Sequence, residues 1–272
     1  MTVRVDLNGV LAGAIGGDGL QPPQLEALGA DLARVRRELG ERRAGGALAF
    51  ADLPYRIDEL RQVTLAADAA RDAFETLVVL GIGGSALGTQ ALASALGGPG
   101  GNGMRLLVSD SIDPGSLQSL LGQVDLERTL FNVVSKSGDT AETMARFLIV
   151  RDRLLREFGA VDYKRHVLVT TQAERGSLRQ IVNDEGFQAL AFPPDIDGRF
   201  SVFTACGLFP AAAAGIDVEE LLAGAAYMDE RMRAAESPLA DPALALAGVL
   251  WSLGTTRGKH IVVLMSYAER LA

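Results

Sequence analysis

The sequence LFNVVSKSGDTAET, at residues 130–143, decides how this chain is organised. Its first five residues, Leu130–Val134, form a short, mostly apolar run with β-branched side chains, which predicts a buried strand. A polar turn, Ser135–Gly138, comes next, and a helical pattern then covers Thr140–Phe158. The stretch therefore predicts a strand, a tight turn and a helix in direct succession.

The turn has the composition of an anion-binding site. The hydroxyls of Ser135, Ser137 and Thr140 and the ammonium of Lys136 all lie at the start of the predicted helix. The first N–H groups of a helix have no intrahelical partners and carry partial positive charge, so amides and hydroxyls together would hold a phosphate dianion. The alternative is an ordinary strand–turn–helix with a hydroxyl cap, because hydroxyls are preferred at that position. This stretch alone leaves both interpretations open.

The same succession of strand and helix repeats along the chain from residue 76 onward. Apolar runs predict five strands, the last of them weaker, at Leu77–Leu80, Leu106–Val108, Phe131–Val134, Val167–Val169 and Ala189–Phe192. Helical patterns separate these runs, at Ser85–Leu96, Pro114–Leu121, Thr140–Phe158 and Ala173–Asn183. The alternation predicts an α/β fold with a doubly wound, parallel five-stranded sheet and helices on both faces. Such sheets bind ligands outside the carboxyl ends of their strands.

Further elements are predicted on either side of the sheet. They are helices at Pro22–Arg43, Ile57–Phe74, Val218–Ala235 and Pro242–Thr256, an apolar helix at Val202–Ala214, and a final strand at Ile261–Met265. No helix follows that final strand to cover it, and exposed strand edges invite pairing. We therefore expect self-association or a partner chain.

Length and charge exclude several classes of protein. The 272 residues suffice for one large α/β domain or two smaller ones. The formal net charge of −8 argues against non-specific nucleic-acid binding and provides no long-range attraction for an anionic substrate. The N-terminus lacks the features of an export signal, and the run Val202–Ala214 is too short to span a bilayer. We expect a cytoplasmic protein with no nucleic-acid or membrane partner.

Cysteine and histidine are too scarce for a structural metal site. Cys206 is the single cysteine, which excludes an internal disulfide and fits a reducing compartment. It lies in an apolar run, so we expect it in the core. The two histidines, His166 and His260, each precede a strand-like run, a position that is typical of an exposed strand end. No zinc site is expected.

The loop after the first strand offers a different function. Gly81-x-Gly83-x-x-Ala86 fits a loose dinucleotide-binding fingerprint, and Asp110, after the next strand, could bind a ribose. On pattern alone, a nicotinamide-dependent oxidoreductase is therefore the main alternative to a protein that binds a phosphate at the turn 135–138. Against it, the doubled glycine followed by Ser85 favours a small anion or a hydroxyl, and the fingerprint leaves the hydroxyl-rich turn at 135–138 unexplained.

Five motifs together are more specific than any one of them. They are LGIGGSALG, VSDSIDP, VVSKSGDTAETM, DGRFSVFTACGLFPAAAAGID and VVLMSYAERLA. Their order and approximate spacing resemble those of glucose-6-phosphate isomerases, over Leu77 to the last residue. The resemblance implies a sugar-isomerase (SIS) domain at residues 74–236, after a helical extension at 1–73 and before the start of a second, truncated α/β domain at 237–272. It also implies reversible conversion of glucose 6-phosphate and fructose 6-phosphate, in glycolysis and gluconeogenesis, without metal or organic cofactor.

The resemblance also implies roles for individual residues. Six of them would bind the substrate, the first two at the sugar and the others at its phosphate: Gly84, Ser85, Ser135, Lys136, Ser137 and Thr140. Arg199 would stabilise negative charge on the enediolate intermediate as a proton moves between C1 and C2. The alternative for Arg199 is an ion pair in an exposed loop.

Two acidic residues depart from the family pattern. Asp139 stands where many members have threonine or another small residue; pointing at the phosphate from about 5–6 Å, it would cost roughly 3 kcal/mol at an effective dielectric near 20. Asp139-x-x-Glu142 has capping-box spacing, so the expected alternative is that Asp139 caps its own helix, where it would compete with the phosphate for the same amides. Asp197 replaces a glycine at a position where positive φ is expected.

The family's proton-moving glutamate, ring-opening histidine and a further lysine come after the segment that resembles Met265–Ala268, and this chain has no counterpart of them. General base catalysis needs such a group within reach of the proton. We therefore expect the binding part of an isomerase, acting as a homo-oligomer or with a partner chain that carries the missing C-terminal half. A non-catalytic sugar-phosphate-binding module is the alternative.

Overall fold

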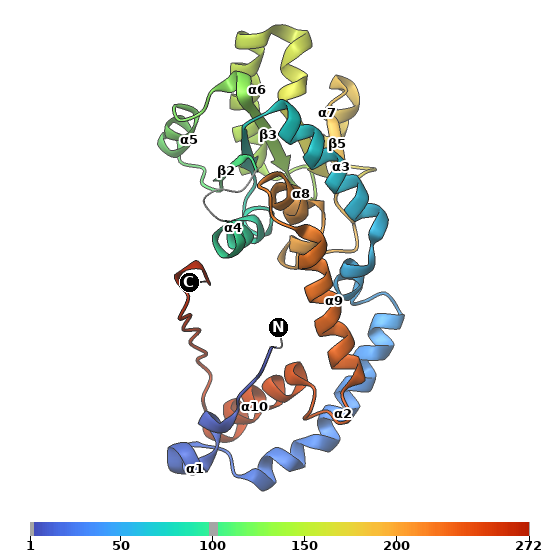
Figure 1. The fold of residues 1–272 in the computed structure, drawn as a ribbon, viewed down its shortest axis with the longest axis vertical. Helices are drawn as coiled ribbons and strands as arrows, with labels where there is room; N and C mark the ends of the chain where they lie inside the picture. The colour runs from blue at the N-terminus through green and yellow to red at the C-terminus, as the bar shows by residue number, and fades with distance from the viewer. Residues whose placement is uncertain (1–2, 98–102, 272) are drawn as a thin grey trace. The chain divides into compact units, whose positions relative to one another are not determined.

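The computed structural model describes residues 3–97 and 103–271. Its contacts divide the chain into two compact units. The helical unit comprises the residues up to Ala51 together with Ala223–Met265, and the sheet unit comprises Asp52–Leu222 together with the residues after Met265. Figure 1 shows the elements of both units.

The sheet unit contains the predicted parallel five-stranded sheet. Its strands are β1 (Thr76–Leu80), β2 (Arg105–Ser109), β3 (Thr129–Val134), β4 (Val167–Thr171) and β5 (Gln188–Ala191). The spatial order is β2-β1-β3-β4-β5, and every neighbouring pair is parallel. Because β2 and β3 lie on opposite sides of β1, the order reverses between β1 and β3. That point is where doubly wound sheets bind their ligands.

The helices between the strands match the predicted ones closely. They are α4 (Gly84–Leu96), α5 (Pro114–Leu121), α6 (Ala141–Asp162) and α7 (Ser177–Glu185). The start of α7 differs from the prediction, which places it at Ala173. The helix begins only at Ser177, because Gly176 has a φ of 100° and interrupts a right-handed helix.

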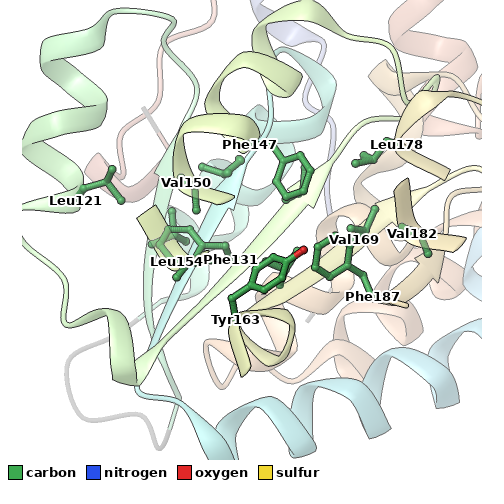
Figure 2. Packing of buried hydrophobic residues seen from close by; sticks show 14 of the residues in the cluster. Leu121, Phe131, Phe147, Val150, Leu154, Tyr163, Val169, Leu178, Val182 and Phe187 are labelled. Atoms are coloured by element: carbon green, nitrogen blue, oxygen red, sulfur yellow. The ribbon is translucent and has the colours of Figure 1, made fainter. Parts of the chain in front are cut away.

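Both faces of the sheet are covered, as predicted. On one face, alternate residues of β1, β3 and β4 pack against α5, α6 and α7. The labelled side chains of Phe131, Phe147, Leu154 and Tyr163 belong to this core (Figure 2). The other face is covered by α3 (Ile57–Ala73), α4 and α8 (Ala205–Ala213), and α8 packs against both other helices and β1. The predicted α/β fold class is confirmed.

The helical unit is built around two of the predicted helices, α2 (Pro22–Ala44) and α10 (Pro242–Arg257). They pack closely where Gly248 meets the side chains of Leu28 and Leu32. The long helix α9 (Val218–Ala234) ends in this unit, where Arg36 donates to the carbonyls of Met232, Arg233 and Ala235. A cation at this end of a helix satisfies carbonyls that have no intrahelical partner.

The expectations for Ile261–Met265 and for His166 are wrong. No strand forms at Ile261–Met265, where the chain is exposed throughout, because no strand of the described residues lies beside it to complete its hydrogen bonds. His166 is fully buried, not exposed, because the ring of Phe158 stacks on it and its Nδ1 lies 3.0 Å from the carbonyl oxygen of Thr129.

The predictions for Cys206 and for the apolar run that contains it have different outcomes. Cys206 is buried, as expected, and burial raises the pKa of its thiol to about 11. The apolar run Val202–Ala214 forms α8 together with the end of a 3₁₀ helix, Gly198–Phe203, and not one continuous helix.

Within the described residues, no helix is long and apolar enough to cross a membrane, and no cluster of His, Cys, Asp or Glu could hold a metal ion.

Candidate functional site

Three loops come together at the point where the strand order reverses. The first follows β1 and runs through Gly81–Gly84 into α4. Gly83 has a φ of 56°, and a Cβ on Gly84 would overlap the carbonyl group of Gly198, so glycine is required at both positions. Gly84 therefore lies directly against Gly198, where the second loop, which leads from β5, enters the 3₁₀ helix at Gly198–Phe203.

Ser201 fixes this approach with its hydroxyl group. The Ser201 Oγ lies 2.7 Å from the carbonyl oxygen of Gly198 and 3.3 Å from that of Gly84. Arg199 lies between Gly198 and Ser201 in the chain and is exposed. It forms no ion pair with any acidic residue that the structure describes, so the alternative of an exposed ion pair is not realised. The arrangement brings the predicted residues Gly84, Ser85 and Arg199 to one region.

The third loop is the turn between β3 and α6. Ser135 is buried, with 1% of its surface exposed, and its Oγ lies 2.9 Å from the Oγ1 of Thr140. The same Oγ accepts a hydrogen bond from the amide of Gly138, whose φ is 76°. Thr140 occupies the N-cap position of α6, yet its side chain accepts no hydrogen bond from the first turn.

This geometry separates the two interpretations of the turn. A hydroxyl cap accepts a hydrogen bond from the second or third amide of its helix. Here the Thr140 hydroxyl is directed to Ser135 instead, so the N-cap side chain leaves the amides at the start of α6 uncapped. The turn therefore presents uncapped helix amides beside a pair of hydroxyls, an arrangement that favours the binding of an anion.

Lys136 connects this turn to the loop that carries Arg199. Its Nζ lies 3.5 Å from a carboxylate oxygen of Asp197. Asp197 has a φ of −76°, so the expectation that this position requires a glycine is wrong. Because an aspartate adopts that backbone without strain, the departure from the family pattern leaves the loop intact and adds a partner for Lys136.

Asp139 does not cap its own helix, contrary to expectation. Its Oδ1 accepts a hydrogen bond from the amide of Ser177, the first residue of α7, at 2.9 Å. The hydroxyl and amide of Ser177 hold the pKa of the Asp139 carboxyl below its usual value. Ser137, also exposed, accepts from the Asp139 amide at 3.2 Å. The Asp139 carboxylate therefore does not occupy the amides of α6.

The loop after β2 is occupied by structural contacts. Asp113 caps α5 by accepting from the amide of Ser116, and Asp110, the possible ribose ligand, accepts from the side-chain amide of Gln90.

Sequence reasoning missed Arg146, which is buried on α6 and reaches the ends of β1 and β2. The available signal was its position, because Arg146 lies on the same helical stripe as Thr143, Phe147 and Val150.

Comparison with known proteins identifies the family. The model of the phosphoglucose isomerase family matches residues 57–272. The chain belongs to the phosphoglucose isomerase family. A glucose-6-phosphate isomerase from Carboxydothermus hydrogenoformans is 38% identical over 280 residues, which cover 100% of this chain and 60% of that protein. Another, from Rubrobacter xylanophilus, is 41% identical over 229 residues, covering 82% of this chain and 52% of that protein.

Solved structures agree with this assignment. A hypothetical protein from Thermus thermophilus matches with a TM-score of 0.82 and 36% identity, covering 92% of this chain and 58% of that one. A glucose-6-phosphate isomerase from Chlamydia trachomatis matches with a TM-score of 0.60 and 27% identity, covering 74% and 37%. The chain thus spans only about half of the length of the curated relatives that it matches.

Proposed function

We propose that this chain supplies the phosphate- and sugar-binding part of a glucose-6-phosphate isomerase. The observation that carries the proposal is the uncapped start of α6 beside the Ser135–Thr140 hydroxyl pair, at the reversal point of the sheet. Family membership favours this reaction over the nicotinamide-dependent oxidoreductase, whose ribose ligand, Asp110, already holds Gln90.

In this proposal, the sugar phosphate enters with its phosphate group at the turn. The amides of the first turn of α6 donate to the phosphate oxygens, and the hydroxyls of Ser135, Ser137 and Thr140 rotate to donate as well. The mutual Ser135–Thr140 hydrogen bond keeps both oxygens together before the ligand arrives. Lys136 adds a positive charge beside them. Since the protein carries a net charge of −8, these local groups provide the attraction.

The sugar would extend from the turn toward the β1 loop, where Gly84 and Ser85 line its pocket. There Arg199 would stabilise the negative charge on the enediolate, and a charge-assisted hydrogen bond of this kind contributes about 1.5–3 kcal/mol. None of the residues assigned to the site is a carboxylate or an imidazole that could move the proton between C1 and C2. We therefore propose that another part of the protein, or a partner chain, supplies the general base.

Calorimetric titration with glucose 6-phosphate tests the phosphate cradle, by which we mean the turn Ser135–Gly138, Thr140 and the first amides of α6. Ser135→Ala and Thr140→Ala should each weaken binding about tenfold or more, because each removes a hydroxyl that contacts a charged group. Ser116→Ala is the matched control, since this serine lies in the first turn of α5 and belongs to no part of the site. Unchanged affinity in both cradle variants would refute the assignment. The chain alone should bind glucose 6-phosphate in the titration but show no turnover in a coupled isomerase assay, and turnover would show that the chain has its own base.

A further inference from the structure

A buried arginine lies beneath the proposed site. Arg146 is 3% exposed and projects from α6, the helix whose N-terminus forms the phosphate cradle. We propose that Arg146 is a positioning residue that holds the β1 loop at a fixed distance from that cradle. The inference rests on the proposed function, because it explains how one sugar phosphate could bridge the two loops.

The guanidinium connects three elements. Its Nη1 donates to the carbonyl oxygen of Ser109, at the end of β2, and lies 3.2 Å from the Ser109 hydroxyl. Its Nη2 donates to the carbonyl oxygen of Gly81, directly after β1, at 3.1 Å. Its Nε donates to the carbonyl oxygen of Glu142, in the first turn of α6, at 3.1 Å. One planar group thus joins α6 to the carboxyl ends of two neighbouring strands.

The chemistry of this position argues against a role in filling space. Neighbouring buried positions of α6 are held by Phe147, Val150 and Leu154, and a methionine would fill the same volume without desolvating a charge. Burial lowers the pKa of the Arg146 guanidinium, while the negative charges of Asp110 and Glu142 oppose that shift. Among the described residues, no carboxylate forms an ion pair with it. The guanidinium instead donates hydrogen bonds to backbone carbonyl oxygens, and it thereby orients those carbonyl groups.

The Gly81 carbonyl controls the part of the loop that would meet the sugar. A Cβ on Gly81 would lie 2.6 Å from the carbonyl oxygen of Ser85, so the chain folds back tightly between these two residues. A shift at Gly81 is therefore passed on to Gly84 and Ser85. Since Arg146 and Thr140 share one helix, the guanidinium sets the separation between the phosphate cradle and the sugar pocket.

The affinities for two ligands distinguish a positioning role of Arg146 from an effect of its charge on the phosphate. Calorimetry with inorganic phosphate reports the cradle alone, and the ratio of its Kd to that of glucose 6-phosphate reports what the sugar adds. Arg146→Met should lower this ratio about fivefold or more, because the loop is released, while the phosphate Kd stays within about twofold. Arg146→Lys keeps the charge but not the planar fork, so it should lower the ratio as well. Should Arg146→Met fail to fold, Arg146→Lys carries the same test.

An equal loss of affinity for both ligands in Arg146→Met, with recovery in Arg146→Lys, would overturn the inference in favour of a charge effect on the phosphate. Unchanged ratios would overturn it too. The control is Arg153→Met, which removes an exposed arginine from the same helix.

Hydrogen–deuterium exchange without ligand keeps this inference separable from the proposed function. Amides of residues 81–88 should exchange faster in Arg146→Met than in the wild type and in Arg153→Met, because the clamp on Gly81 is lost. Unchanged exchange would overturn the inference. If the wild type binds neither ligand, the proposed function fails, whereas the exchange experiment still decides whether Arg146 holds the loop.

Discussion

Replacing Asp197 by asparagine should strengthen binding of the phosphate. The carboxylate of Asp197 lies 3.5 Å from the Nζ of Lys136, and its side chain is 71% exposed. A phosphate oxygen that accepts a charge-assisted hydrogen bond of about 2.8 Å on the other side of that ammonium would lie about 6 Å from the carboxylate, and the phosphorus bonded to it about 7 Å away. Asp197→Asn removes one negative charge at this distance and preserves the shape of the side chain.

The expected gain follows from Coulomb's law. A dianion and a single charge about 7 Å apart repel by about 1.2 kcal/mol at the dielectric constant of water, which suits so exposed a pair. Screening reduces this to about 0.5 kcal/mol at 0.15 M salt, where the Debye length is about 8 Å, and to about 0.9 kcal/mol at 0.01 M. The variant should therefore bind glucose 6-phosphate about twofold more tightly at 0.15 M salt and about fivefold more tightly at 0.01 M.

Calorimetric titration at both salt concentrations measures the effect. Asp195→Asn is the matched control, because it removes the same charge from the same loop at a residue that pairs with Arg56 and not with Lys136. A gain that is absent, that does not depend on salt, or that is equally large in Asp195→Asn would refute the placement of the phosphate beside Lys136.

Three further predictions concern packing, pH and association. Gly84→Ala should destabilise the protein by about 1–3 kcal/mol, because its Cβ would overlap the Gly198 carbonyl, and should also weaken glucose 6-phosphate binding; thermal unfolding and calorimetry check the two effects. Burial lowers the pKa of His166, so below about pH 6.5 the unfolded chain binds a proton that the folded chain does not, and the stability of the fold decreases as the pH is lowered. The melting temperature of His166→Phe should therefore decrease less than that of the wild type over the same pH range. The exposed apolar segment Ile261–Met265 should cause self-association that Leu264→Ser reduces, and a wild type that stays monomeric in light scattering at high concentration would contradict this.

The strands of the sheet could be predicted because each is a continuous apolar run. Leu77–Leu80 and Val167–Val169 are buried on both faces, and burial of this kind leaves a direct record in the residue types. The same signal misled at Ile261–Met265, whose residue types are those of a strand. A strand also needs a hydrogen-bonded neighbour, and the residue types of one segment do not specify whether another segment will lie beside it.

The contacts that build the site could be predicted only in part. The order of strands brings the β1 loop, which contains Gly84, and the β3 turn, which contains Ser135, to the same edge of the sheet, and this placement could be inferred from topology. The contact between Lys136 and Asp197 depends on where the chain returns after β5, which no local pattern records. His166 was misjudged for a similar reason, since the stacking ring of Phe158 reaches it from a helix.

The two acidic residues that depart from the family pattern bear on the proposed anion site in different ways. Each carboxylate has a partner of its own, but the partners differ in consequence. Asp139 accepts the first amide of α7, so its charge is stabilised by a helix that takes no part in the cradle. Asp197 instead holds Lys136, a group that the phosphate would also use. In the proposed site, a ligand would therefore share Lys136 with Asp197 but meet no such competition from Asp139, so we expect Asp197 to be the carboxylate that limits affinity.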